Sequence, residues 1–174
     1  MKIIALLSSL LFSTFAFGQT YPTKPIRLVV PFAPGGSSSI VARSVAMEME
    51  KGLGQSIVIE NKGGGGGNIA MSEVARAEPD GYTLIIGHVG SLAMTPFITP
   101  NLGYDVNRDF AAVSLLAKVP NIFVVHADVP AKDLREFLAL ARARPGQLYY
   151  GSAGNGSAGH LAMEYLKLLS GVQI

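Results

Sequence analysis

The residues most suited to chemistry lie in three glycine-rich turns of the sequence, at positions 33–39, 63–68 and 151–159. Glycine has no Cβ atom, so the backbone N–H groups of such turns can approach a ligand closely. The helix that each turn is expected to begin adds unpaired N–H donors and a partial positive charge. Uncharged hydroxyl and amide groups on the turns donate further hydrogen bonds, and they belong to Ser37, Ser38, Ser39, Asn68, Ser152, Asn155 and Ser157. Together these groups predict a site that holds a small anion, best a carboxylate, reversibly.

Each turn is predicted to lie between a strand and a helix. Runs of β-branched and aromatic residues favour strands at 26–32, 56–60 and 82–87, and apolar residues at helical spacing favour helices at 40–51 and 69–77. The same patterns recur in the second half, with strands at 111–116, 121–126 and 148–152 and helices at 132–143 and 160–169. This alternation predicts an α/β fold with a mostly parallel sheet and flanking helices. Because ligands bind beyond the carboxyl ends of parallel strands, the turns should share one site. Taken singly, each turn is better explained by glycines that close a turn and serines that cap a helix.

Composition and motifs exclude several other classes of protein. The chain of 174 residues has no cysteine, which excludes disulfides, thiolate zinc sites, iron–sulfur clusters and cysteine nucleophiles. Its 14 basic and 12 acidic residues are too evenly balanced for a nucleic-acid-binding surface. Residues 154–159 match a dinucleotide-binding fingerprint, but a lone match is weak, and no P-loop or G-x-S-x-G motif occurs. The three histidines, His88, His126 and His160, have no metal-ligand spacing, so we expect neither a cofactor nor a metal.

Several side chains beside the turns have two interpretations. Lys62 and Arg43 lie close enough to a glycine turn to reach a carboxylate, but a loop lysine or a helix arginine is more often a solvated surface charge. His88 follows a strand end and could line a cleft, whereas His160 is expected to pack against its helix or cap it. No arrangement of nucleophile, base and oxyanion hole is apparent, so catalysis is unsupported.

The first 18 residues have the pattern of a cleaved export signal. Lys2 precedes an apolar run of about fifteen residues, and Ala16 and Gly18 place small residues at positions −3 and −1 of a cut before Gln19. A membrane anchor is the alternative, but the run is shorter than the roughly 20 residues that span a bilayer. Farther along the chain, residues 96–108 form a predicted loop rich in Pro, Asn and Gly, which marks a boundary between two lobes. We therefore expect a signal peptide at 1–18, a first α/β lobe at 19–104 and a partial second α/β lobe at 105–174.

Eight motifs follow one another along residues 21–174: YPTKPIRLVVPFAPGG (21–36), IVAR (40–43), LGQSIVIENK (53–62), GGNIA (66–70), PDGYTL (79–84), RDFAAVSLLA (108–117), VPAK (129–132) and YGSAGNGSAGHL (150–161). In this order they resemble the Bug-type solute-binding receptors of tripartite tricarboxylate transporters. Members are similar to periplasmic binding proteins, in which two α/β lobes enclose a cleft. The resemblance implies a periplasmic, non-catalytic receptor that needs no cofactor. Such a receptor captures a small organic acid, for example a di- or tricarboxylate, and delivers it to a membrane permease.

The resemblance also implies which residues bind the ligand. From the first lobe they are Pro34, Gly35, Gly36, Ser37, Ser38, Ser39, Gly66, Gly67 and Asn68, with Gly90 and Ser91 after the third strand. From the second lobe, Ser152, Asn155, Gly156 and Ser157 should face them. Most of these residues lie in the turns selected above on physical grounds.

Three departures from the family pattern matter. Ser39 stands where many members carry an aspartate, so the cleft lacks a carboxylate that would pair with a ligand ammonium, and we expect plain carboxylates to be preferred over amino acids. Gly63 and Gly65 replace the usual proline and alanine, which makes that loop costlier to order. Family members are also nearly twice as long. Two alternatives stay open: a secreted α/β hydrolase or transferase that uses serines of the glycine turns, and a non-functional, truncated receptor whose uncovered sheet surface aggregates.

Overall fold

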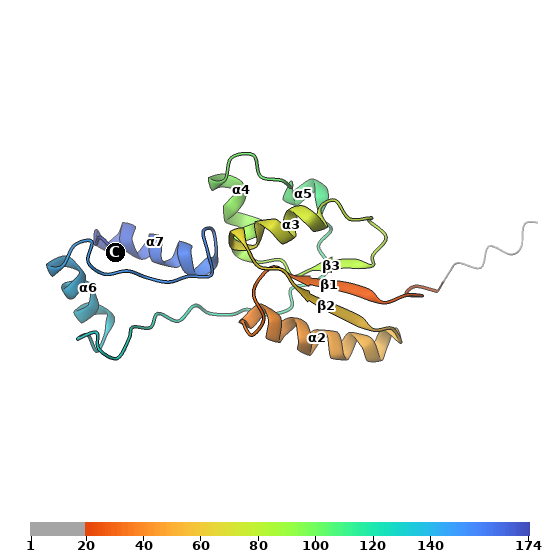
Figure 1. Ribbon diagram of the computed structural model, residues 1–174, viewed down its shortest axis with the longest axis horizontal. Helices are drawn as coiled ribbons and strands as arrows, with labels where there is room; N and C mark the ends of the chain where they lie inside the picture. The colour runs from red at the N-terminus through yellow and green to blue at the C-terminus, as the bar shows by residue number, and fades with distance from the viewer. Residues whose placement is uncertain (1–19) are drawn as a thin grey trace, which may run out of the picture.

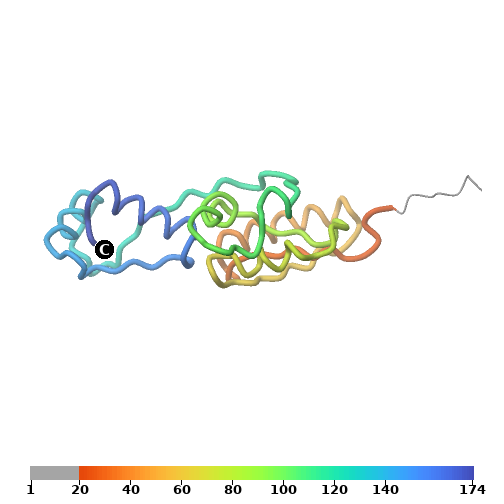
Figure 2. The backbone as a smooth tube through the Cα atoms, turned by 90° about the horizontal axis from the view of Figure 1, so that it is seen from above, coloured from red at the N-terminus to blue at the C-terminus, as the bar shows by residue number. Residues whose placement is uncertain are grey.

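The computed structural model describes residues 20–174, so the predicted signal peptide and its cleavage site between Gly18 and Gln19 lie outside the described residues. Figure 1 shows an elongated molecule, with a small sheet and its helices in one part and two further helices in the other. Figure 2 shows the same two parts in a row, with the chain crossing from one to the other and ending in the second. We call them the sheet part and the helical part.

The sheet part is built on a three-stranded parallel sheet with the strand order β2-β1-β3. The strands are β1 (Ile26–Val30), β2 (Ile57–Asn61) and β3 (Thr83–Ile85). In the register of the sheet, Val29 pairs with Glu60 on one side and with Ile85 on the other. Two helices, α2 (Ser37–Leu53) and α3 (Asn68–Val74), cover opposite faces of the sheet (Figure 1). The three parallel strands and both helices confirm the α/β prediction for this part of the chain.

The core forms on both faces of β1, the central strand. One face is a cluster with α2 that contains Ile26, Leu28, Val30, Ala42, Ala46, Ile57 and Ile86. The other face is a smaller cluster with α3 that contains Val29, Ala70 and Val74. A strand covered on both faces needs apolar side chains in both directions, which explains the continuous apolar run from Leu28 to Val30. Since the strands are parallel, all three end at the same edge of the sheet, and the turns that follow them gather there.

Short elements continue the chain after β2 and β3. A 3₁₀ turn, η1 (Gly65–Gly67), leads into α3, and a π-helical turn, η2 (Gly90–Met94), leads into α4 (Thr95–Ile98). The single turn α5 (Val106–Asp109) closes the sheet part. The helical part contains α6 (Leu134–Ala143) and α7 (Ala158–Ser170). Each of its helices begins at a side-chain cap, because Asp133 accepts a hydrogen bond from the Glu136 N–H and Ser157 accepts one from the His160 N–H.

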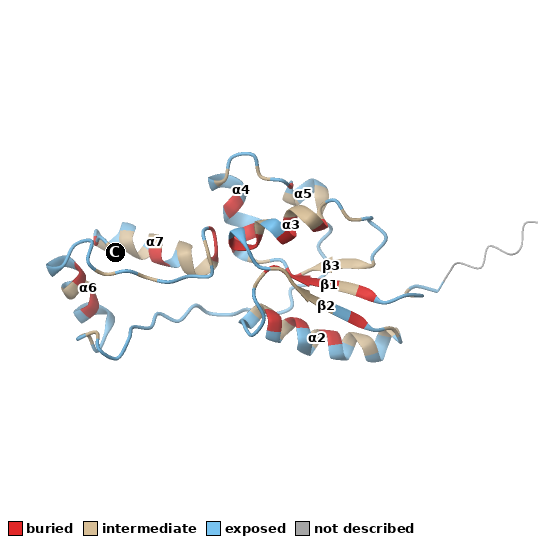
Figure 3. Ribbon diagram, in the orientation of Figure 1, coloured by how far each residue is buried: buried red, intermediate tan, exposed pale blue. Residues whose placement is uncertain are grey.

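The strands predicted at 111–116, 121–126 and 148–152 are wrong for the structure as described: these segments have no strand hydrogen bonding. Figure 1 shows the first two as one long, irregular connection between α5 and α6. Their β-branched residues suit a strand, but a strand also requires a neighbour that offers N–H and C=O groups. Val113 and Ile122 consequently expose 85% and 80% of their surface. Figure 3 shows the same contrast, with burial concentrated around the sheet and the connection almost wholly exposed. Within residues 20–174, none of the helices has the length and apolar content needed to cross a membrane.

Candidate functional site

The two parts of the molecule meet through glycine backbone. A Cβ atom added to Gly66 would lie 2.0 Å from the carbonyl oxygen of Asn155, and one added to Gly90 would lie 2.1 Å from the carbonyl oxygen of Gly156. Real Cβ atoms essentially never approach another heavy atom within 3.0 Å, so no residue but glycine fits either position without movement. Gly66 has in addition a φ angle of +64°, which side chains disfavour. We call this set of four residues the glycine contact.

Hydroxyl groups are buried around the glycine contact. Ser91, Thr95 and Ser157 are each at most 1% exposed. The Ser91 hydroxyl donates to the carbonyl oxygen of His88 at 3.2 Å, and the Ser157 hydroxyl caps α7. The Thr95 hydroxyl has no hydrogen-bond partner among the described residues, and it lies 2.8 Å from the position that a Cβ of Gly156 would take. The contact is therefore a dense, water-excluding arrangement of small polar residues.

Tyr104 joins two of the predicted ligand residues. Its hydroxyl lies 2.7 Å from the carbonyl oxygen of Ser91 and 3.1 Å from Oδ1 of Asn68. Burial raises the pKa of this phenol above its usual value, so the group stays protonated and acts as a donor. The sequence analysis did not select Tyr104, because it lies outside the eight motifs and the residues around it offered no local signal for this role.

Two histidines support the glycine contact from opposite sides. The Gly90 N–H donates to Nδ1 of His88 at 3.0 Å, and the Gly156 N–H donates to Nδ1 of His160 at 3.3 Å. Burial lowers the pKa of His88 below its usual value, which favours the neutral ring that such an acceptor requires. The expectation that His88 lines a cleft stays a prediction. His160 lies in the first turn of α7, as its position in the sequence suggested, but its ring faces back toward the turn.

The first glycine turn lies at the same edge of the sheet and remains open. Pro34, Gly35, Gly36 and Ser37 are exposed and Ser38 is half-buried. Proline has no N–H group, so the donors at the start of α2 are the N–H groups after Pro34 and the serine hydroxyls. Ser39 differs from them because it is fully buried, and its hydroxyl donates to Oδ1 of Asn61 at 3.4 Å. The amide of Asn61 in turn donates to the carbonyl oxygen of Phe32 at 3.0 Å. Ser39 thus ties the turn to β2.

The charged groups beside the second glycine turn are paired with one another. Arg27 of β1 donates to Glu60 of β2 at 2.6 Å and to Glu73 of α3 at 2.5 Å, and Lys62 also pairs with Glu73. Hydrogen bonds from Lys62 and Arg27 hold the pKa of the Glu73 carboxyl below its usual value, and Arg27 does the same for Glu60. Lys62 is therefore not a free surface charge, and its contact with a ligand carboxylate stays a prediction. Lys62 precedes the glycine turn and Glu73 follows it, so their ion pair fixes both ends of that turn. Arg43 is exposed on α2.

The structure therefore brings some of the predicted site residues together and leaves others apart. Gly66, Gly90, Asn155, Gly156 and Ser157 meet in the glycine contact or beside it. Asn68 and Ser91 join it through Tyr104, and Gly67 packs against Pro31 below it. Ser152 is exposed and accepts a hydrogen bond from the Gly154 N–H at 3.3 Å. The exposed turn at 34–38 has no hydrogen bond to the helical part in the described structure.

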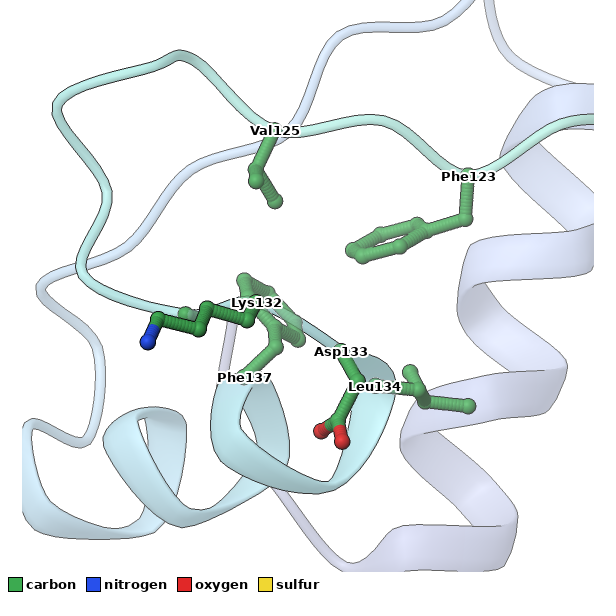
Figure 4. Close-up of a pocket in the computed structure, with 7 residues that line it drawn as sticks. Phe123, Val125, Lys132, Asp133, Leu134 and Phe137 are labelled. Carbon is green, nitrogen blue, oxygen red and sulfur yellow. The ribbon is translucent and has the colours of Figure 1, made fainter.

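A cavity of about 250 Å³ lies elsewhere, in the helical part (Figure 4). Phe123, Val125 and Phe137 direct apolar side chains into it, and the rings of Phe123 and Phe137 are 4.8 Å apart. None of its lining residues is a predicted ligand residue. Among the described residues, no group of three or more His, Asp or Glu side chains is arranged to hold a metal ion.

The fold and the glycine turns at one edge of the sheet define the chain as a protein of the periplasmic-binding-protein class. Comparison with known proteins gives the family. Residues 41–174 match the Tripartite tricarboxylate transporter family receptor, and the chain belongs to that family. Protein BugT of Bordetella pertussis is 35% identical over 157 residues, which are 90% of this chain and 48% of BugT. The chain spans about half the length of the curated relatives it matches.

Two solved structures with bound acids are similar to this chain. Rpa4515 of R. palustris, described with adipate, is 42% identical with a TM-score of 0.85, and the match covers 88% of this chain and 52% of that one. MatC from Rhodopseudomonas palustris, described with bound malate, is 39% identical with a TM-score of 0.83 and the same coverage. The Bug-type resemblance and the two-lobed fold class are confirmed.

Proposed function

We propose that this chain is an extracytoplasmic receptor that captures a small carboxylate between its two parts and delivers it to the permease of a tripartite tricarboxylate transporter. The observation that carries the proposal is the glycine contact. There the turns of the sheet part meet a turn of the helical part backbone to backbone, at the carboxyl ends of the parallel strands. That edge of a parallel sheet is where ligands bind in α/β proteins.

The chemistry of the groups near the contact favours an anion. The exposed turn at 34–38 offers N–H groups at the start of α2, a helix of 17 residues, and the positive end of its dipole. The nearby acidic side chains, Glu60 and Glu73, are already neutralised by Arg27 and Lys62. An acid therefore meets donors at this edge without a free carboxylate to repel it. The adipate and malate in the two similar structures agree with this class of ligand.

In the proposed receptor, residues 19–104 form the first lobe and residues 105–174 contribute to the second. Phe110 packs against the core beside Val29, so the chain continues along the first lobe for a few residues beyond that boundary. We infer no catalytic step, because the proposed site offers hydrogen-bond donors without a nucleophile and base in contact. The family supports a periplasmic location, and we expect the export signal to be cleaved between Gly18 and Gln19.

A thermal melt of the mature chain, residues 19–174, tests the proposal. Malate and adipate are the test ligands, and their neutral diamides are the controls. A ligand at about 100 times its dissociation constant adds about 2.7 kcal/mol to the free energy of unfolding, which raises the melting temperature by several degrees for a domain of this size. A rise with an acid and none with its diamide supports an anion-binding receptor. A cooperative melt that neither acid shifts, or conversion of the acid into a product, contradicts the proposal.

A further inference from the structure

His88 and His160 occupy matching positions on the two sides of the glycine contact. His88 follows β3 in the sheet part, and His160 lies in the first turn of α7 in the helical part. Each ring holds one of the two glycines that touch, since the Gly90 N–H donates to His88 and the Gly156 N–H donates to His160. The two imidazoles therefore converge on one point, although they are 72 residues apart in the sequence.

These hydrogen bonds determine which nitrogen of each ring accepts a hydrogen bond and which is left to donate one. A nitrogen that accepts a hydrogen bond from a backbone N–H carries no proton, so Nδ1 is unprotonated in each case. The proton of a neutral imidazole must then be on Nε2, and both side chains present an Nε2–H donor on the side of the ring away from the glycine. Both histidines are partly exposed, and within residues 20–174 no hydrogen bond to either Nε2 is present. Each ring therefore has a second nitrogen that no protein group of residues 20–174 engages.

The surroundings of the rings place these donors among the glycine turns. The ring of His88 packs edge-on against Phe32, the residue before the first glycine turn, with ring centres 5.0 Å apart. The ring of His160 stacks on Tyr150, the residue before the third glycine turn, at 6.4 Å. Tyr150 is itself held by a hydrogen bond of 2.7 Å to Glu164. Packing on one side and a backbone hydrogen bond on another restrict the rotation of each ring, so the donors have defined directions.

We propose that the Nε2–H groups of His88 and His160 donate to the carboxylate groups of the bound acid, one from each part of the molecule. This inference rests on the proposed function and names two residues that would give it specificity. Since one donor belongs to each part of the molecule, a ligand that accepts from both histidines would also link the two parts. Recognition by such N–H groups uses directed hydrogen bonds, which suit reversible capture of an acid.

The test is a set of substitutions that separates the two nitrogens. Asparagine places Oδ1 where Nδ1 was, so His88→Asn and His160→Asn keep the acceptor for the glycine N–H but lose the distal donor. Glutamine carries an amide N–H near the former Nε2, so His88→Gln and His160→Gln keep a distal donor but lose the acceptor. His126→Asn is the matched control, because His126 is exposed in the helical part and remote from the contact. Calorimetric titration with malate and adipate is the assay, and a thermal melt of each variant accompanies it.

A hydrogen bond to a charged group is worth enough to change affinity by at least about tenfold. We expect each Asn variant at positions 88 and 160 to bind the acid at least about tenfold more weakly with an unchanged melting temperature, and His126→Asn to bind like the unsubstituted chain. If the rings only hold the glycines in place, the Asn variants will bind normally and the Gln variants weakly. That result overturns the inference and leaves the proposed function intact. If the unsubstituted chain binds neither acid, that result contradicts the proposed function and this inference together.

Discussion

Replacing Gly90 with alanine should force the two parts of the molecule apart and weaken ligand binding. Gly90 has no positive φ angle, so alanine adds no backbone strain and the effect comes from the new Cβ alone. That atom would lie 2.1 Å from the carbonyl oxygen of Gly156, against a practical minimum of 3.0 Å. The turn that contains Gly156 must therefore retreat by at least 0.9 Å, the difference between these distances.

The cost of this movement follows from what the contact buries. Forcing extra atoms into close-packed structure costs about 1–3 kcal/mol. A retreat of the turn also opens the buried surroundings of Ser91, Thr95 and Ser157 to water. If the ligand is held between the two parts, the same 1–3 kcal/mol is lost from binding, which is roughly a 5- to 150-fold rise in the dissociation constant.

Calorimetric titration with malate measures the effect, and a thermal melt shows whether the variant folds. Gly52→Ala is the matched control, because Gly52 lies in α2, has no positive φ angle and has nothing within 4 Å of the added Cβ. There alanine should stabilise the helix by about 0.5–1 kcal/mol and leave affinity unchanged. If Gly90→Ala melts cooperatively and binds malate as well as Gly52→Ala does, the glycine contact is not part of the binding site.

Three further predictions concern single side chains. Thr95→Val should increase the free energy of unfolding by about 1 kcal/mol and so raise the melting temperature, because it removes a buried hydroxyl that has no partner among the described residues. A lower melting temperature would show that the hydroxyl has a hydrogen-bond partner. Since Lys62 lowers the pKa of Glu73 below its usual 4.5, the Glu73 ion pairs stabilise the fold fully above that pH and are lost as the pH falls below it. The melting temperature of the unsubstituted chain should therefore fall more steeply than that of Glu73→Gln in melts from about pH 6 to about pH 3, and parallel curves would contradict this. Ser39→Asp should weaken malate binding, because it places a negative charge in the buried space beside Oδ1 of Asn61. The neutral variant Ser39→Asn should weaken malate binding less. Equal affinities of the two variants in calorimetry would refute the electrostatic reasoning.

The secondary structure of the sheet part could be predicted from the sequence because its signals are local. The apolar run that became β1 and the helical spacing that became α2 are read within a few residues, and both elements formed close to their predicted bounds. The turns between them were also predictable, since glycine and serine mark such positions by their own backbone preferences. Segments 111–116 and 121–126 carry the same local signal and formed no strand. Pairing is a property of two segments, and one sequence window contains only one of them.

The sequence by itself determined the α/β class, the family and the glycine turns, because these depend on residue types at short spacing. Only the tertiary structure decided that Gly66 and Gly90 touch the turn at 155–156, that Lys62 pairs with Glu73, and that His88 and His160 hold the two sides of one contact. Each of these facts depends on the directions in which distant backbone segments approach. Those directions are set by packing across the sheet and between the two parts, to which every segment contributes and which no single segment encodes.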